Sequence, residues 1–290
     1  MKLAFLLTSV FLFLVRCSCS MQEKSKVGKL SELTAVLYDP ALKPFYHGVA
    51  SGDPLADRVI LWTRVTPEDS LLSIPVTWEI STNENFNSIV MSDSMSTAPS
   101  RDYTIKIDVT GLQPDTYYYY RFKALEKYSP VGRTKTAPAL RKDSLSFAVV
   151  SCSNWEFGYF NAYDRIAERE VNAVIHLGDF IYEYAPGIYG DTTIGRIHLP
   201  PHEIVTLQDY LTRYSQYRLD QGLRRVSMRH PFIAIWDDHE VANNVYTHGA
   251  QNHQPAQEGD FEKRKASARQ AYYEWIPIRE GSKHYRSFSF

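Results

Sequence analysis

The chain has 290 residues, 44% of them hydrophobic and 13% aromatic, so it can bury the cores of two domains of ordinary size. Its 32 basic and 33 acidic side chains give a formal net charge of −1. This balance provides no overall field toward nucleic acid or an anionic membrane, which argues against a nuclease and leaves anion binding to a local site.

The N-terminus has the pattern of an export signal. Lys2 precedes an apolar run at residues 3–15 that has signal-peptide length and is short for a membrane span. We therefore expect residues 1–20 to direct the export of a bacterial protein that is periplasmic, secreted or lipid-anchored at the cell surface. Cys17 or Cys19 is the candidate for a lipid anchor, and cleavage nearby without an anchor is the alternative.

An all-β region follows a short tether. Residues 21–42 have mixed charge and no firm periodicity, whereas residues 43–138 contain short runs that alternate with a period near two. These runs lie between Pro, Gly, Asp and Asn turns, at residues 48–53, 58–64, 76–80, 103–109 and 116–122. About seven strands in roughly a hundred residues predict a β-sandwich. The turn followed by a tyrosine at residues 111–117 is the pattern of a fibronectin type III strand corner, so we expect a fibronectin type III-like domain.

Residues 143–290 are predicted to form an α/β sheet domain. Apolar runs predict parallel strands at residues 145–150, 173–177 and 231–236, and helical spacing predicts helices at residues 159–170, 207–219 and 260–275. Residues 285–290 resemble the start of another strand. The stretch 184–201 is rich in Tyr, Gly and Pro and is expected to form a rim over the strand ends.

Each predicted parallel strand ends at polar residues. Because the carboxyl ends of parallel strands lie at one edge of a sheet, Cys152 and Asp179 should be neighbours in space. Once residues 1–20 are removed, Cys152 is the only cysteine left, and a lone thiol in an oxidising compartment is best tolerated when it is buried or bound to metal.

The side chains at this edge offer carboxylates, a thiolate, a phenolate and an amide oxygen. Such donors suit hard or borderline cations, and two adjacent cations suit the attack of a metal-bound hydroxide on phosphorus. The sequence contains no Gly-x-Ser-x-Gly elbow and no phosphate-cradling Gly-rich loop. It therefore predicts a metal-dependent hydrolase.

Several separated motifs resemble one family. Residues 45–54 with 61–64, then 151–154, 176–183 and 236–243, are similar to the N-terminal sandwich and catalytic motifs of the alkaline phosphatase D family of calcineurin-like metallophosphoesterases. This resemblance implies an exported alkaline phosphatase or phosphodiesterase that acts on a phosphate ester. Family members are associated with iron (Fe3+) and calcium (Ca2+) at a binuclear or trinuclear site.

The resemblance also implies roles for single residues. Asp179 would bridge two metals, Tyr182 would supply a phenolate to ferric iron, and Cys152 would be an iron ligand. Asp238 would bind metal, and His239 would stabilise the transition state or protonate the leaving group. The alternatives are a small buried hydrophobe for Cys152, a helix cap for Asp179 and a structural role for His239.

Three further residues are weaker candidates. Asn243 is a candidate contact to calcium or phosphate. Asp237 is a candidate metal ligand. Because adjacent carboxylates repel each other, the alternative is that it holds a backbone group or an arginine. Asn154 either orients a ligand or binds phosphate as part of the catalytic set, or it only closes a turn.

Two features depart from the family pattern. The N-terminus has no Arg-Arg pair, which favours the general secretory route, and no second half of the sheet follows Phe290. We therefore expect residues 143–290 to be the N-terminal half of the catalytic domain. We expect the 290-residue chain, a monomer, to be weakly active or inactive, with a folded sandwich and a poorly folded α/β part. The rival interpretation is an exported binding or adhesion protein in which the sandwich is the working module.

Overall fold

The computed structural model describes residues 34–69, 71–281 and 286–290. The predicted signal segment, Cys17, Cys19 and the first part of the tether lie outside these residues. Residues 38–290 form one compact unit, and residues 34–37 belong to another. None of the described helices has the length and apolar character needed to cross a membrane.

Eight strands of the N-terminal region form a β-sandwich, as predicted. They are β1 (Val49–Leu55), β2 (Arg58–Arg64), β3 (Ile74–Ser81), β4 (Ile89–Thr97), β5 (Thr104–Thr110), β6 (Tyr117–Ala124), β7 (Lys127–Tyr128) and β8 (Gly132–Lys135). One sheet has the order β4-β3-β6-β7, with β8 also on β6, and the other contains β5-β2-β1. Two short 3-10 helices, η1 (Pro40–Leu42) and η2 (Pro99–Arg101), flank these strands, and η1 lies inside the segment predicted to be a tether.

The sheet that contains β5-β2-β1 does not end at the sandwich. Strand β1 pairs in parallel with β11 (Phe232–Ala234), with Gly52 opposite Phe232, and the six-stranded sheet has the order β5-β2-β1-β11-β10-β9. A Cβ at Gly52 would lie 2.0 Å from the carbonyl oxygen of Pro277, so only glycine permits this approach. The two predicted domains therefore share one continuous sheet.

Strands β1 and β2 are buried on both faces because they lie between two cores. Val49 and Leu61 pack in the core between the sandwich sheets, whereas Ala50 and Trp62 pack with the helices of the α/β part. The Trp62 ring also contacts Trp275, with 5.6 Å between ring centroids. Trp62 therefore belongs to the core of the α/β part and not to the core between the sandwich sheets.

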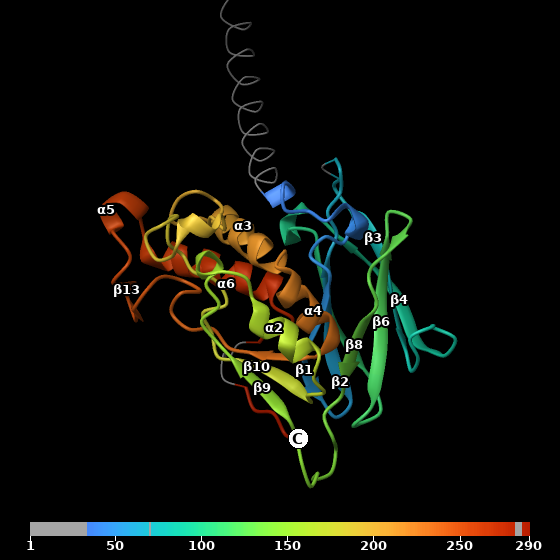
Figure 1. Ribbon diagram of the computed structural model, residues 1–290. Coiled ribbons are helices and arrows are strands. Elements are labelled where there is room, and N and C mark those ends of the chain that lie inside the picture. The colour runs from blue at the N-terminus through green and yellow to red at the C-terminus, as the bar shows by residue number, and fades with distance from the viewer. Residues whose placement is uncertain (1–33, 70, 282–285) are drawn as a thin grey trace, which may run out of the picture. The chain divides into compact units, whose positions relative to one another are not determined.

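The α/β part contains the three predicted parallel strands. Strands β9 (Phe147–Val150) and β10 (Ala173–His176) pair in parallel, and β10 pairs in the same sense with β11. The helices are α2 (Asn161–Ala167), α3 (Leu207–Arg218), α4 (Gln221–Arg229), α5 (Pro255–Glu258) and α6 (Phe261–Trp275), with the 3-10 helices η3 (Trp155–Phe157) and η4 (Thr192–Ile194) and the hairpin β12 (Val245–Tyr246) and β13 (Gly249–Ala250). Figure 1 shows the helices on one side of β9 and β10.

Capping residues explain where the long helices begin. Thr206 and Asp209 form a reciprocal capping box at the start of α3, and Asp260 accepts a hydrogen bond from the N–H of Glu262 at the start of α6. Helix α4 was not predicted as a separate element. Within it, Arg225 is exposed and pairs with Asp164 of α2 at 2.7 Å.

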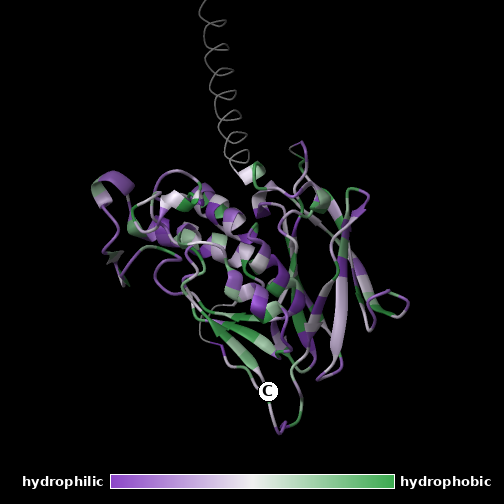
Figure 2. Ribbon diagram, in the orientation of Figure 1, coloured by the Kyte–Doolittle hydropathy of each residue, from purple (hydrophilic) through white to green (hydrophobic). Residues whose placement is uncertain are grey.

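The other face of the α/β strands is apolar and exposed. Val149, Leu177 and Ile235 are 61%, 51% and 41% exposed. Figure 2 shows the hydrophobic character of β9 and β10. Residues 286–290, predicted to begin a strand, form none, and the Phe290 ring packs edge-on against Phe147 at 5.0 Å between centroids.

Candidate metal centre

The ends of β9 and β10 are tied together by backbone hydrogen bonds. The N–H of Cys152 donates to the carbonyl of Gly178 at 3.2 Å, and the N–H of Ser153 donates to that of Asp179 at 3.1 Å. The prediction that Cys152 and Asp179 are neighbours is therefore confirmed. Both have positive φ angles, 57° and 54°, a conformation that strains a residue with a side chain and is concentrated at functional sites.

Gly178 brings the end of β10 against the end of β11. Its φ angle is +106°, and a Cβ on it would lie 2.5 Å from both the Cβ and the backbone nitrogen of Asp237. A side chain at this position would push the two turns apart. Glycine therefore allows the residues that follow β10 and β11 to meet.

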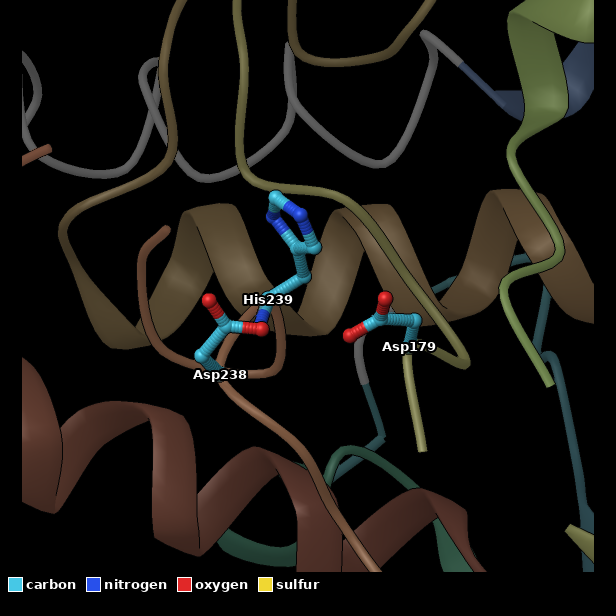
Figure 3. Close-up of side chains that lie close together, drawn as sticks. All are labelled: Asp179, Asp238 and His239. Atoms are coloured by element: carbon cyan, nitrogen blue, oxygen red, sulfur yellow. The ribbon is translucent and has the colours of Figure 1, made fainter. Parts of the chain in front are cut away.

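Three predicted site residues converge in this region. Asp179, Asp238 and His239 each offer one ligand atom, and these atoms all lie within 4.8 Å of one another. Figure 3 shows the two carboxylates on neighbouring turns, with the His239 ring beside them. The two carboxylates are close enough to share a cation, and the imidazole ring lies beside the position that such a cation would occupy.

Asp179 has the environment of a cation ligand. It is 7% exposed, and its Oδ1 has no hydrogen-bond partner among the described residues. Burial raises the pKa of Asp179 above its usual value of 3.8, a rise to which the charge of Asp238 adds and which the charge of His239 opposes. A buried carboxylate oxygen without a donor is costly, and a bound cation would remove that cost.

Cys152 and Tyr182 both interact with the Asp179 carboxylate. The Tyr182 hydroxyl donates to Oδ2 at 3.3 Å, and Cys152 is close enough to act against the rise in the pKa of Asp179. Burial, followed by the charges of Asp179 and Cys152, raises the pKa of Tyr182, so the phenol is neutral unless a cation is bound. Cys152 is exposed, so it is not the small buried hydrophobe of the alternative interpretation.

The remaining candidates lie around this cluster. Asp237 is exposed and close enough for its charge to raise the pKa of Asp179. The Asn243 amide donates to Gln251 Oε1 at 3.3 Å. Asn154 is 4% exposed, and its Oδ1 accepts from the N–H of Glu156 at 2.9 Å, as expected of a residue that closes a turn.

Glu183 is a site residue that the sequence analysis did not single out. It is fully buried; its Oε2 accepts from Nδ1 of His239 at 2.7 Å, and its Oε1 accepts from the Asn243 N–H at 2.7 Å. Burial alone would lower the pKa of His239, but the hydrogen bond and charge of Glu183, with the charges of Asp179 and Asp238, outweigh it and raise the pKa. The signal in the sequence was its place at the end of the segment 176–183.

Glu240 is the second residue that was overlooked. It is fully buried, and its carboxylate accepts from the N–H groups of Asp179 at 3.1 Å, Phe180 at 2.5 Å and Asp237 at 2.7 Å. Burial raises the pKa of Glu240 to about 8, against these three bonds. One side chain therefore holds the turns after β10 and β11 in place.

The fold and the candidate site are those of an α/β protein that binds a ligand or metal at the carboxyl ends of its parallel strands. An α/β sheet with carboxylates and a histidine at the carboxyl ends of its parallel strands has its ligand or metal site at that edge. The sequence matches the PhoD-like phosphatase model at residues 147–290 and the N-terminal domain of PhoD-like phosphatases at residues 32–138.

Two known proteins are similar over most of the chain. Alkaline phosphatase D of Bacillus subtilis (strain 168) is 41% identical over 247 residues, which are 82% of this chain and 42% of the relative. A solved structure described as the structure of PhoD superposes with a TM-score of 0.79 at 39% identity, and covers 87% of this chain and 51% of its own. The chain therefore belongs to the PhoD-like phosphatase family, and it spans less than half the length of the Bacillus relative.

Proposed function

We propose that this chain is a metal-dependent hydrolase of phosphate esters. The observation that supports this most strongly is the convergence of Asp179, Asp238 and His239 within 4.8 Å, in a member of a phosphatase family. The Bacillus relative is named an alkaline phosphatase, and we extend that activity to this chain.

The residues around the cluster have two proposed roles, metal binding and proton donation. Asp179 and Asp238, with Tyr182 and Cys152, would hold the metal. A bound metal would lower the pKa of a water molecule and neutralise charge on the phosphate oxygens. His239 is oriented by Glu183 at Nδ1, which leaves Nε2 to give a proton to the departing alcohol oxygen.

The metals proposed are Fe3+ and Ca2+, at a site with two or three ions. The Tyr182 hydroxyl and the Cys152 thiol beside Asp179 support iron, because phenolate and thiolate ligands suit ferric iron better than they suit calcium. Asp237 and Asn243 are proposed contacts of the calcium. A catalytic role for Asn154 is not favoured by its turn-closing contacts.

We also propose that the protein is exported and that its sandwich has a fibronectin type III-like topology. On the strength of residues 1–20, we propose a signal-directed protein that is periplasmic, secreted or lipid-anchored. A fibronectin type III-like topology for the sandwich is supported by Tyr118, whose buried hydroxyl accepts from the N–H of Gln113 at 2.8 Å. That bond resembles the tyrosine corner of such sandwiches.

The function can be tested with three variants of the metal-loaded chain. Asp179→Asn should lose bound metal and activity together. His239→Ala should retain the metal and lose turnover by roughly a hundred- to ten-thousandfold, as expected of a general acid. Asp143→Asn, a change at an exposed carboxylate, is the matched control and should alter neither property.

Hydrolysis of an aryl phosphate and bound metal are measured on the same samples. Equal metal loss in Asp179→Asn and His239→Ala would contradict the role of His239 as an acid. A wild-type chain that folds, binds metal and hydrolyses no phosphate ester would reject the proposed function and favour the binding-protein interpretation.

A further inference from the structure

A cavity adjoins the candidate metal centre on the side of β9. Its volume is about 490 Å³, which is within the range of small-molecule sites. It lies between the end of β9 and the segment η3–α2, and its lining includes Cys152, Asn154, Phe157, Tyr159, Phe160 and Tyr163. The lining contains no Asp, Glu, Lys, Arg or His, and its titratable groups are one thiol and two phenols. The cavity therefore suits an uncharged group.

Aromatic rings connect this cavity to the catalytic residues. The Tyr189 ring stacks near His239, with 6.1 Å between centroids, and lies edge-on to Phe157 at 5.5 Å. It is also stacked on Tyr182, at 5.7 Å. Tyr189 thus lies between the metal centre and the cavity, and with Phe157 and Tyr159 of the cavity lining it forms the aromatic wall.

The aromatic wall is exposed although it is rich in apolar surface. Phe157, Tyr159 and Tyr189 are 61%, 70% and 46% exposed. Exposed rings that gather beside a cavity mark a surface that gains free energy when a ligand covers it. Planar aromatic ligands suit such a wall best, because rings attract each other in offset-stacked and edge-on arrangements.

Buried polar side chains hold this wall in position. Asn154 Nδ2 donates to the carbonyl of Tyr189 at 2.8 Å. Glu156 is fully buried, and its carboxylate accepts from the N–H groups of Gly187 and His198, both at 3.0 Å. The segment that carries Tyr189 is therefore preorganised, and a ligand need not order it on binding.

We propose that this cavity binds the alcohol portion of an aryl phosphate ester, with the phosphate at Asp179, Asp238 and His239. The assignment rests on the proposed function, which places the phosphate at the metal centre. Phe157 and Tyr189 are then specificity-determining residues. They distinguish esters of aromatic alcohols from esters of aliphatic ones.

The test uses 1-naphthyl phosphate and butyl phosphate as substrates of the metal-loaded chain. Phe157→Leu should lower kcat/KM for 1-naphthyl phosphate by about two- to twelvefold, through KM, and leave butyl phosphate nearly unchanged. Tyr128→Leu is the matched control, because Tyr128 is a half-exposed ring in the sandwich strand β7, and it should leave both substrates unaffected.

A binding measurement separates this inference from the proposed function. Equilibrium binding of 1-naphthol, followed by its fluorescence, should weaken in Phe157→Leu and Tyr189→Leu and not in Tyr128→Leu. If the chain binds 1-naphthol through Phe157 and hydrolyses neither ester, the aromatic site stands and the proposed function fails. If wild type does not bind 1-naphthol, or if both esters lose activity equally in Phe157→Leu, the inference is overturned.

Discussion

Gly178→Ala should separate the two turns that form the candidate metal centre. The added Cβ would lie 2.5 Å from Asp237, whereas ordinary contacts begin at 3.4 Å, so the turns must part by about 0.9 Å. Metal sites tolerate changes in ligand distance of about 0.2 Å. The substitution should therefore weaken metal binding at least tenfold although it removes no ligand.

The same substitution should also lower the free energy of unfolding. The φ angle of +106° costs a residue with a side chain about 1 to 3 kcal/mol, and the overlap with Asp237 adds about 1 to 3 kcal/mol. The sum is a large part of the stability of an ordinary domain, about 5 to 15 kcal/mol. Titration calorimetry with Ca2+ and thermal unfolding without metal measure the two effects separately.

Gly111→Ala is the control for the backbone contribution. Gly111 also has a positive φ angle, +79°, but a Cβ there would have no neighbour within 4 Å. This variant should lose about 1 to 3 kcal/mol of stability and keep its metal affinity. Wild-type metal affinity in Gly178→Ala, or equal losses of affinity in both variants, would refute the steric explanation.

Three further outcomes follow from the structure. The hydrogen bond from Arg133, with further bonds from Arg229 and Tyr117, lowers the pKa of Glu170 from 4.5 to about 2. The stability that Glu170 contributes is therefore present above pH 4.5 and lost as the pH falls toward 2; Glu170→Gln should reduce the acid dependence of unfolding in this window, and an unchanged profile would contradict the pairing. Tyr182→Phe should abolish the visible phenolate-to-iron absorption expected of the iron-loaded protein, and a retained band would remove Tyr182 from the metal. Leu177→Lys, at a residue 51% exposed on the bare face of the sheet, should reduce self-association in light scattering with little change in thermal stability, and unaltered scattering would show that this face does not drive association.

The sequence alone identified the elements whose side chains repeat regularly. Apolar runs located β9, β10 and β11, and helical spacing located α3 and α6 to within a residue or two. The polar residues after those strands gave the candidate site, since parallel strands must end at one edge. Consecutive residues encode these features, because each depends on local periodicity and on where a strand stops.

Only the tertiary structure revealed the continuous sheet and the side chains that support the site. The pairing of β1 with β11 depends on the close approach of Gly52 to Pro277, which no local pattern encodes. Glu183 meets His239 56 residues later in the chain, and Glu240 bonds to the N–H of Asp179 61 residues before it. From the sequence alone, a buried glutamate after an apolar strand cannot be distinguished from an exposed one. Its burial, and therefore its role, is decided by packing between segments that are distant in the chain.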